Sequence, residues 1–154
     1  MGNNVLSNIR ILRFSDQLTN VEALTLMAKQ AVEAKWAKPG FVEAVLEREG
    51  KYATGLHTAG VEVAIPHADP EWTITPGMVI AICDQPIGFQ PMGGMGGEVL
   101  ARFVFLLIIP DADAHISFLQ ALAGFIEDGD RLSELERTKD ISSLLDYLNQ
   151  AVEV

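Results

Sequence analysis

The sequence predicts a single layered α/β domain, because amphipathic helical segments and apolar strand-like runs share the chain and no linker, repeat or low-complexity segment divides it. The chain has 154 residues, of which 49% are hydrophobic and 21% charged. About 150 residues are enough to bury most of the surface that an unfolded chain exposes. We therefore expect residues 1–154 to form one domain around one compact core.

The first helix is predicted from Thr19 to about Trp36. The run Thr19-Asn20-Val21-Glu22 has the form of a capping box, in which the threonine and glutamate side chains each bind the other's backbone N–H. Pro39-Gly40 introduces a second helical stripe, which Gly50 would end as a left-handed cap. Arg48 therefore falls in the last turn of the second helix.

Three apolar runs predict strands. Val61, Val63 and Ile65 alternate with Glu62 and Ala64, and Pro66 favours extended backbone before it, so this short strand ends at His67. The runs Val79–Asp84 and Arg102–Ile109 are more continuously apolar, which is typical of central strands covered on both faces.

Residues 85–99, QPIGFQPMGGMGGEV, predict a loop between the two central strands because they are dense in glycine and proline. The run Met92–Gly97 lacks the lysine and the Ser/Thr of a phosphate-binding P-loop. We expect a mobile connection, whose two methionines would suit an adaptable docking surface.

The last third of the chain predicts helices. Asp111 and Asp113 are candidate N-caps of a third helix, which Gly129 would end. A short segment around Leu132–Leu135 and a last amphipathic helix complete the chain. The helical stripes are formed by Phe118, Leu119, Leu122, Ala123, Phe125 and Ile126, and then by Ile141, Leu144, Leu145 and Leu148.

Composition narrows the classes of partner. The formal net charge is −10, from 11 basic and 21 acidic side chains, which disfavours nucleic acid and anionic membranes and favours fast encounter with a basic protein.

The first twenty residues lack the apolar core of a secretion signal. The longest apolar stretch, Phe103 to Ile109, is far shorter than the roughly 20 residues that span a bilayer. Cys83 is the one cysteine, so it forms no internal disulfide and is expected to be a small buried hydrophobe. We expect a cytoplasmic protein without membrane insertion.

Three histidines are candidates for chemistry, although a lone histidine is more often structural or solvated. His67 differs from His57 and His115 because it follows a strand directly, and catalytic side chains favour the carboxyl ends of strands in α/β folds. Pro66 restricts the backbone just before it. With an ordinary pKa of about 6.5 its imidazole is largely neutral in the cell and can act as a nucleophile.

These residues carry a resemblance to a known family. The succession Arg48-Glu49, Thr54-Gly55 and Ala64-Ile65-Pro66-His67, followed by Pro110 and by His115 before a leucine-rich helix, resembles the enzyme IIA component of the fructose/mannitol/galactitol type in the bacterial sugar phosphotransferase system. The likeness covers nearly the whole chain. The R-E-x-x-x-x-T-G lead-in and the spacing from Arg48 to His67 look most like the galactitol branch.

The resemblance implies a phosphocarrier with a mixed β-sheet flanked by α-helices. His67 would accept a phosphoryl group from the phosphocarrier protein HPr and pass it to an enzyme IIB, while His115 and Arg48 match the family's second histidine and its arginine. Phosphoryl transfer requires mainly alignment and donors around the phosphoryl oxygens, and no metal or cofactor is required here. Arg48 could instead only complement its helix dipole, and His115 could be an ordinary first-turn residue.

Two other functions stay open. A nitrogen-related regulatory module of the same fold would use phosphorylation of the same histidine to change its binding to a target protein. A metal enzyme built on the three histidines is weaker, because His57 and His115 are far apart in the chain and no H-x-x-x-H or C-x-x-C spacing occurs. His57 matches no motif position and is expected to be a solvated loop residue.

Overall fold

One mixed β-sheet organises this computed structural model, which describes residues 8–58 and 60–152 except for the side chains of 112–115 and 149–152. Its strands run in the order β1-β4-β5-β3-β2. The strands are β1 (Ile9–Phe14), β2 (Gly55–Leu56), β3 (Val63–Ala64), β4 (Gly77–Phe89) and β5 (Val99–Ile108). The pairs β1–β4 and β3–β5 are parallel, whereas β4–β5 and β2–β3 are antiparallel.

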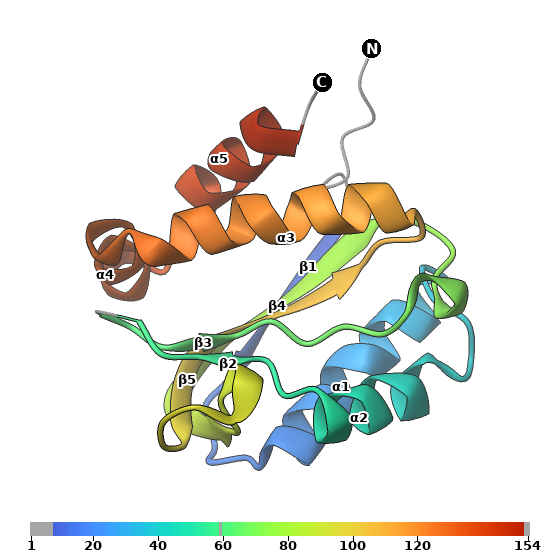
Figure 1. Ribbon diagram of the computed structural model, residues 1–154, viewed down its shortest axis with the longest axis horizontal. Helices are drawn as coiled ribbons and strands as arrows, with labels where there is room; N and C mark the ends of the chain where they lie inside the picture. Colours follow the sequence, from blue (N-terminus) through green and yellow to red (C-terminus); the bar gives the residue numbers. More distant parts are fainter. Residues whose placement is uncertain (1–7, 59, 153–154) are drawn as a thin grey trace.

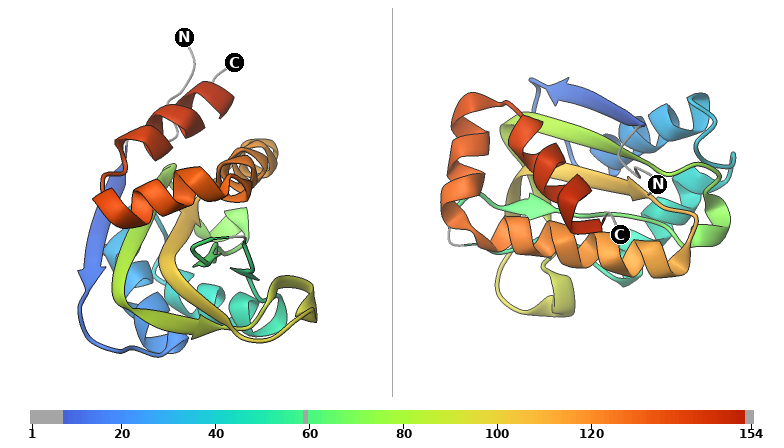
Figure 2. Two further views of the ribbon diagram at one scale, coloured as in Figure 1. Left: turned by 90° about the vertical axis from the view of Figure 1, so that its left-hand side faces the viewer. Right: turned by 90° about the horizontal axis from the view of Figure 1, so that it is seen from above.

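Helices cover both faces of the sheet, so the molecule has three layers (Figure 1). The helices α1 (Asn20–Glu33) and α2 (Phe41–Lys51) lie on one face. The helices α3 (Ala112–Glu127), α4 (Gly129–Thr138) and α5 (Ser142–Val152) lie on the other, as the two turned views also show (Figure 2). This arrangement confirms the predicted layered α/β domain with a mixed sheet.

The apolar residues form two cores, one on each face of the sheet, and not the one compact core that was expected, because strand periodicity divides them. In β4, Met78, Ile80 and Ile82 face the α3–α5 side, and the intervening Val79, Ala81 and Cys83 face the α1–α2 side. The same alternation in β5 directs its phenylalanines toward α3. Successive side chains of a strand point to opposite faces, so a fully apolar strand supplies both cores at once. Cys83 is fully buried, as predicted.

The capping box of α1 is present as predicted. The Thr19 hydroxyl accepts the Glu22 N–H at 3.1 Å, and the Glu22 carboxylate accepts the Thr19 N–H at 2.9 Å. The helix ends at Glu33, earlier than expected, because Lys35 turns into the left-handed region with φ of 65°.

Three predicted boundaries were wrong. Gly50 does not cap α2: the helix continues to Lys51, and Tyr52 ends it with φ of −131°, an ordinary extended value. Gly129 does not end α3 but begins α4, because the Asp128 side chain accepts the backbone N–H groups of Asp130 and Arg131. The strand predicted over residues 61–65 pairs regularly only at Val63–Ala64.

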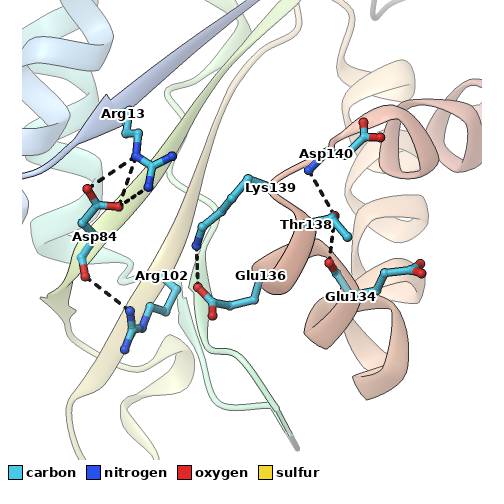
Figure 3. A network of polar contacts seen from close by, with 8 residues as sticks. All are labelled: Arg13, Asp84, Arg102, Glu134, Glu136, Thr138, Lys139 and Asp140. Carbon is cyan, nitrogen blue, oxygen red and sulfur yellow. Dashed lines mark hydrogen bonds and ion pairs between the residues drawn. The ribbon is translucent and has the colours of Figure 1, made fainter.

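The loop predicted over residues 85–99 is shorter, because β4 continues to Phe89 and β5 begins at Val99. The register of β4 against β5 shifts between Ile82 and Ile87, and beyond that bulge Ile87 and Phe89 are buried. Figure 3 shows the polar contacts beside it. Arg13 of β1 binds the Asp84 carboxylate at 2.8 Å, and Arg102 of β5 donates to the Asp84 carbonyl at 3.3 Å.

The edge strand β1 was not predicted. Its sequence IRILRF places two arginines among apolar residues, and half of the strand is exposed, so it lacks the continuous apolar signal of β4 and β5.

Among the described helices, none has the length and apolar character needed to cross a membrane.

Candidate functional site

His67 lies at the carboxyl end of β3, where the backbone is held to β5. The Leu107 N–H donates to the Pro66 carbonyl at 3.2 Å, and His67 forms an isolated parallel bridge with Leu107. Because β3 and β5 are parallel, both end at this edge of the sheet, and α3 begins four residues after the last residue of β5. The predicted strand-end position of His67 is confirmed.

A hydrogen bond to the backbone sets the tautomer of the His67 ring. Nδ1 lies 3.0 Å from the carbonyl oxygen of Ile65, and the residue is 8% exposed. A carbonyl can only accept, so Nδ1 carries the hydrogen, and in the neutral ring the lone pair is on Nε2. Pro66 fixes the backbone between the carbonyl and the ring. In the neutral ring, Nε2 is therefore the nitrogen that carries the lone pair.

Arg48 is attached to the segment that carries His67. It lies in the last turn of α2, as predicted, and its Nη1 donates to the Asp69 carboxylate at 2.8 Å. Its guanidinium carbon is 5.3 Å from the centre of the Tyr52 ring, a cation–π contact. Its buried Nε has no hydrogen-bond partner among the described residues. The ion pair with Asp69 and the cation–π contact with Tyr52 orient the guanidinium.

Asp69 was missed by the sequence reasoning. It follows His67 by two residues and stands just before Pro70, the first residue of the short 3-10 helix η1 (Pro70–Trp72). Together with Arg48, Tyr52 and Trp72 it lines a groove of about 330 Å³ between α2 and η1. The signal that could have found Asp69 in the sequence is its carboxylate, which comes two residues after the candidate phosphoryl acceptor His67.

His115 lies in the first turn of α3, the helix that starts beyond the end of β5. This backbone position agrees with the sequence analysis. The side chain lies outside the described residues, so its contacts with His67 or Arg48 stay a prediction.

Glu49, also missed, secures the end of α2 next to Arg48. It is buried, and its two carboxylate oxygens accept the Thr54 N–H at 2.9 Å and the Thr54 hydroxyl at 2.7 Å. Burial raises the pKa of Glu49 above its usual value, and the two Thr54 hydrogen bonds oppose that rise. The pair fixes the connection from α2 to β2.

His57 is an exposed residue outside the helices and strands, as expected, but both nitrogens of its ring have partners. Nδ1 is 2.6 Å from the Glu62 carboxylate, and Nε2 is 2.7 Å from the Gly97 carbonyl. His57 and Glu62 precede β3 and His67 follows it, so the two histidines lie at opposite ends of this strand. No group of three or more side chains that could hold a metal ion occurs in the part of the chain that the structure describes.

The glycine-rich connection adopts backbone that requires glycine. Gly93, Gly94 and Gly96 have φ of 74°, 71° and 85°, in the left-handed region that other residues rarely enter. His57 binds this loop through Gly97, at the end of β3 that lies opposite His67. The loop is separate from the His67 edge, and its predicted mobility stays a prediction.

The fold resembles solved phosphotransferase structures. The E. coli complex of mannitol-type enzyme IIA with phosphorylated enzyme IIB contains a chain that superposes with a TM-score of 0.72 at 22% identity, covering 92% of this chain and 94% of that one. Nitrogen regulatory protein IIA-Ntr from Neisseria meningitidis superposes with a TM-score of 0.67 at 18% identity, covering 92% and 93%. At these identities the likeness concerns the fold alone.

Sequence comparison gives the family. The mannitol-specific EIICBA component of Vibrio cholerae is 28% identical over 130 residues, which are 82% of this chain and 19% of that protein. The chain thus spans about a fifth of the length of such relatives. The family model for the phosphoenolpyruvate-dependent sugar phosphotransferase system, EIIA 2, matches residues 4–151. With the strand-end histidine and the three-layered mixed sheet, this match shows that the chain belongs to the type-2 EIIA family, the phosphoryl-carrying components of the sugar phosphotransferase system.

Proposed function

We propose that this chain accepts a phosphoryl group from HPr on Nε2 of His67 and passes it to an enzyme IIB of the mannitol type. The observation that supports this most directly is the hydrogen bond from His67 Nδ1 to the Ile65 carbonyl, which puts the ring's lone pair on Nε2. Family membership supports the reaction class. The cytoplasmic location expected from the sequence stays a prediction.

The transfer balances without an added cofactor. As the bond between phosphorus and the donor's histidine nitrogen breaks, its electron pair returns to the donor ring, and the lone pair of His67 Nε2 forms the new N–P bond. Nδ1 keeps its hydrogen on the Ile65 carbonyl, so the ring holds one orientation in both states. Onward transfer to enzyme IIB is the same displacement, with His67 as the leaving group.

Arg48 and His115 are the proposed supporting residues. Arg48 would donate to the phosphoryl oxygens from its remaining N–H groups, its plane being set by Asp69 and Tyr52. His115 would donate a hydrogen bond from the first turn of α3, where the helix dipole also favours negative charge.

The type of sugar system is proposed from the relatives. The sequence motifs look galactitol-like, whereas the relative reported above is mannitol-specific. We therefore favour a mannitol-type enzyme IIB as acceptor over a galactitol-type one. Transfer from the phosphorylated chain to purified enzyme IIB proteins of both types measures this choice directly.

A regulatory role is the second candidate, favoured by the similarity to the nitrogen regulatory protein. In that case His67 would still be phosphorylated, but the phosphoryl group would alter binding to a target protein. Efficient onward transfer to an enzyme IIB would favour the carrier, and phosphorylation-dependent binding without transfer would favour the regulator.

The test is reconstitution with enzyme I, HPr and phosphoenolpyruvate. The wild-type chain should be labelled on His67, and the label should be acid-labile and stable in alkali, as expected of a phosphoramidate. His67→Ala should remove the label and leave thermal unfolding unchanged, whereas His57→Ala, the matched histidine control, should keep it. Full labelling of His67→Ala would overturn the proposal.

The same assay tests the supporting residues. His115→Ala should still accept the phosphoryl group but transfer it poorly, and Arg48→Ala should be slower than Arg48→Lys, which keeps a positive charge. Loss of one preorganised donor costs about 3 kcal/mol at the transition state, or on the order of a hundredfold in single-turnover rate. Near-native transfer by both alanine variants would leave His67 alone in the site.

A further inference from the structure

The bond between Arg48 and Asp69 places a second negative group beside the proposed phosphoryl site. The carboxylate accepts Nη1 of Arg48 at 2.8 Å. The Arg48 side chain is 33% exposed and that of Asp69 is 62% exposed, so the ion pair lies at the rim of the groove and not in the core. Water and anions can therefore reach it.

Asp69 and His67 are close enough to share one arginine. They are two residues apart, and extended backbone rises about 3.3 Å per residue, so their Cα atoms are at most about 7 Å apart. Asp69 itself is extended, with φ of −64° and ψ of 149°. A phosphoryl group on His67 would thus lie within reach of a guanidinium that already binds Asp69.

The unmodified and the phosphorylated states of His67 differ in charge. A phosphoryl group brings about two negative charges at neutral pH and competes with a carboxylate for the same donors. Two like charges that share one cation also repel each other. Asp69 therefore reduces the stabilisation of the phosphoryl group by Arg48, because it competes for the guanidinium and because its own negative charge repels the phosphoryl group.

We propose that Asp69 is a positioning residue that acts through Arg48: it holds the guanidinium while His67 is unmodified and competes for it once His67 is phosphorylated. This inference rests on the proposed function of His67. Competition prevents Arg48 from over-stabilising the phosphoryl group, so the group stays easy to pass on. Asp69 thereby sets the phosphoryl-transfer potential of the chain.

The experiment measures the equilibrium of phosphoryl exchange between HPr and the chain. Asp69→Asn keeps the shape and an acceptor oxygen but removes the charge. It should shift the equilibrium toward the phosphorylated chain by about fivefold, the size expected of a partly exposed charge interaction, and slow onward transfer. A residue that merely braced Arg48 would shift the equilibrium in the opposite direction when altered.

Matched variants separate the causes. Glu71→Gln removes the same charge two residues further along, from an exposed side chain without a described bond to Arg48, and should leave the equilibrium unchanged. In an Arg48→Ala background Asp69→Asn should have less than half of its effect, because competition for the guanidinium is gone. Asp69→Glu should stay near wild type.

The outcomes are distinguishable from those of the proposed function. If wild-type protein is labelled on His67 but Asp69→Asn leaves the equilibrium unchanged or shifts it toward HPr, the role of Asp69 is overturned and the phosphocarrier stands. If neither HPr nor phosphoramidate, a small-molecule phosphoryl donor, labels His67 in any variant, both proposals fall together. Thermal unfolding of each variant confirms that the fold is intact.

Discussion

His67 depends on residues that adjoin it in the chain. Pro66 restricts the backbone, and the carbonyl of Ile65 takes the Nδ1 hydrogen at 3.0 Å. The bridge to Leu107 holds the same segment to the sheet. The orientation of the ring is therefore set locally, whereas Arg48 and Asp69 come together across 21 residues of sequence.

Glu49 and Thr54 show how one buried polar pair supports this arrangement. The carboxylate spans both donors of Thr54, so losing the hydroxyl would leave a buried oxygen without its partner. We predict that Thr54→Val lowers the free energy of unfolding by about 1–3 kcal/mol, measured by urea denaturation at neutral pH. Thr25→Val in α1 is the control, since Thr25 loses only a local bond to Val21 at the surface.

The loss of stability caused by Thr54→Val should be smaller in acid than at neutral pH. The folded-state pKa of Glu49 is raised by burial, so the folded protein binds that proton more tightly than the unfolded chain does, and the group's contribution to stability decreases as pH rises through the raised pKa. Thr54→Val removes a bond that lowers this pKa, so its cost should shrink in acid, where the carboxyl is protonated. An equal loss at acidic and neutral pH would contradict this explanation.

At the scale of elements, the clamp formed by His57, Glu62 and Gly97 ties the β4–β5 connection to the start of β3. Both ring nitrogens of His57 face acceptors, and only the protonated imidazolium can donate to both. Glu62 also accepts the Leu100 N–H at 3.0 Å, which joins the clamp to β5. A groove between His57 and α3 is also lined by Glu127, which adds a second carboxylate on the side of His57 that faces α3.

We predict that this clamp weakens as pH rises. The hydrogen bond that His57 donates to the Glu62 carboxylate, and then the one it donates to the Gly97 carbonyl, raises the pKa of His57 above its usual value. Its contribution is therefore fully present below the unfolded pKa of about 6.5 and is lost as pH rises through the raised value. NMR titration of the His57 ring and hydrogen exchange at Gly97 measure this. Glu62→Gln should lower the His57 pKa, and an unchanged titration would refute the clamp.

At the scale of the whole molecule, the three layers place the proposed site at one edge. The parallel strands β3 and β5 end together there, α3 starts there, and the end of α2 is bound to the same edge through Asp69. Two apolar cores hold the sheet from both sides, so His67 and Leu107 belong to a rigid base. The net charge of −10 surrounds this base with a negative field.

That charge predicts salt-dependent encounter with the donor protein. The single-turnover rate of transfer from phosphorylated HPr should fall as salt rises, because the screening length shortens from about 30 Å at 0.01 M to about 8 Å at 0.15 M. Labelling by phosphoramidate is the control, since no protein encounter is involved. A transfer rate from HPr that is independent of salt would argue against electrostatic steering.

Much of the fold could be predicted because its signals are local. The capping box at Thr19, the apolar runs of β4 and β5, and the helical stripes of α3 and α5 each lie within a few residues of sequence. The errors fell where tertiary packing overrides local preference. Residues 85–89 read as loop but pair beyond a bulge because β5 lies alongside, and Gly50 continues a helix that Glu49 and Thr54 hold in place.

By itself, the sequence determined the α/β class, the strand-end position of His67 and the place of Arg48 in the last turn of α2. These follow from periodicity, proline geometry and motif order, all of which act between near neighbours. Only the tertiary structure decided that Asp69 binds Arg48, that Glu49 is secured by Thr54, and that His57 clamps the glycine-rich loop. Those contacts depend on how α2 and the strands pack across the sheet. Because packing brings together residues that are far apart in the sequence, no local sequence pattern predicts these side-chain partners.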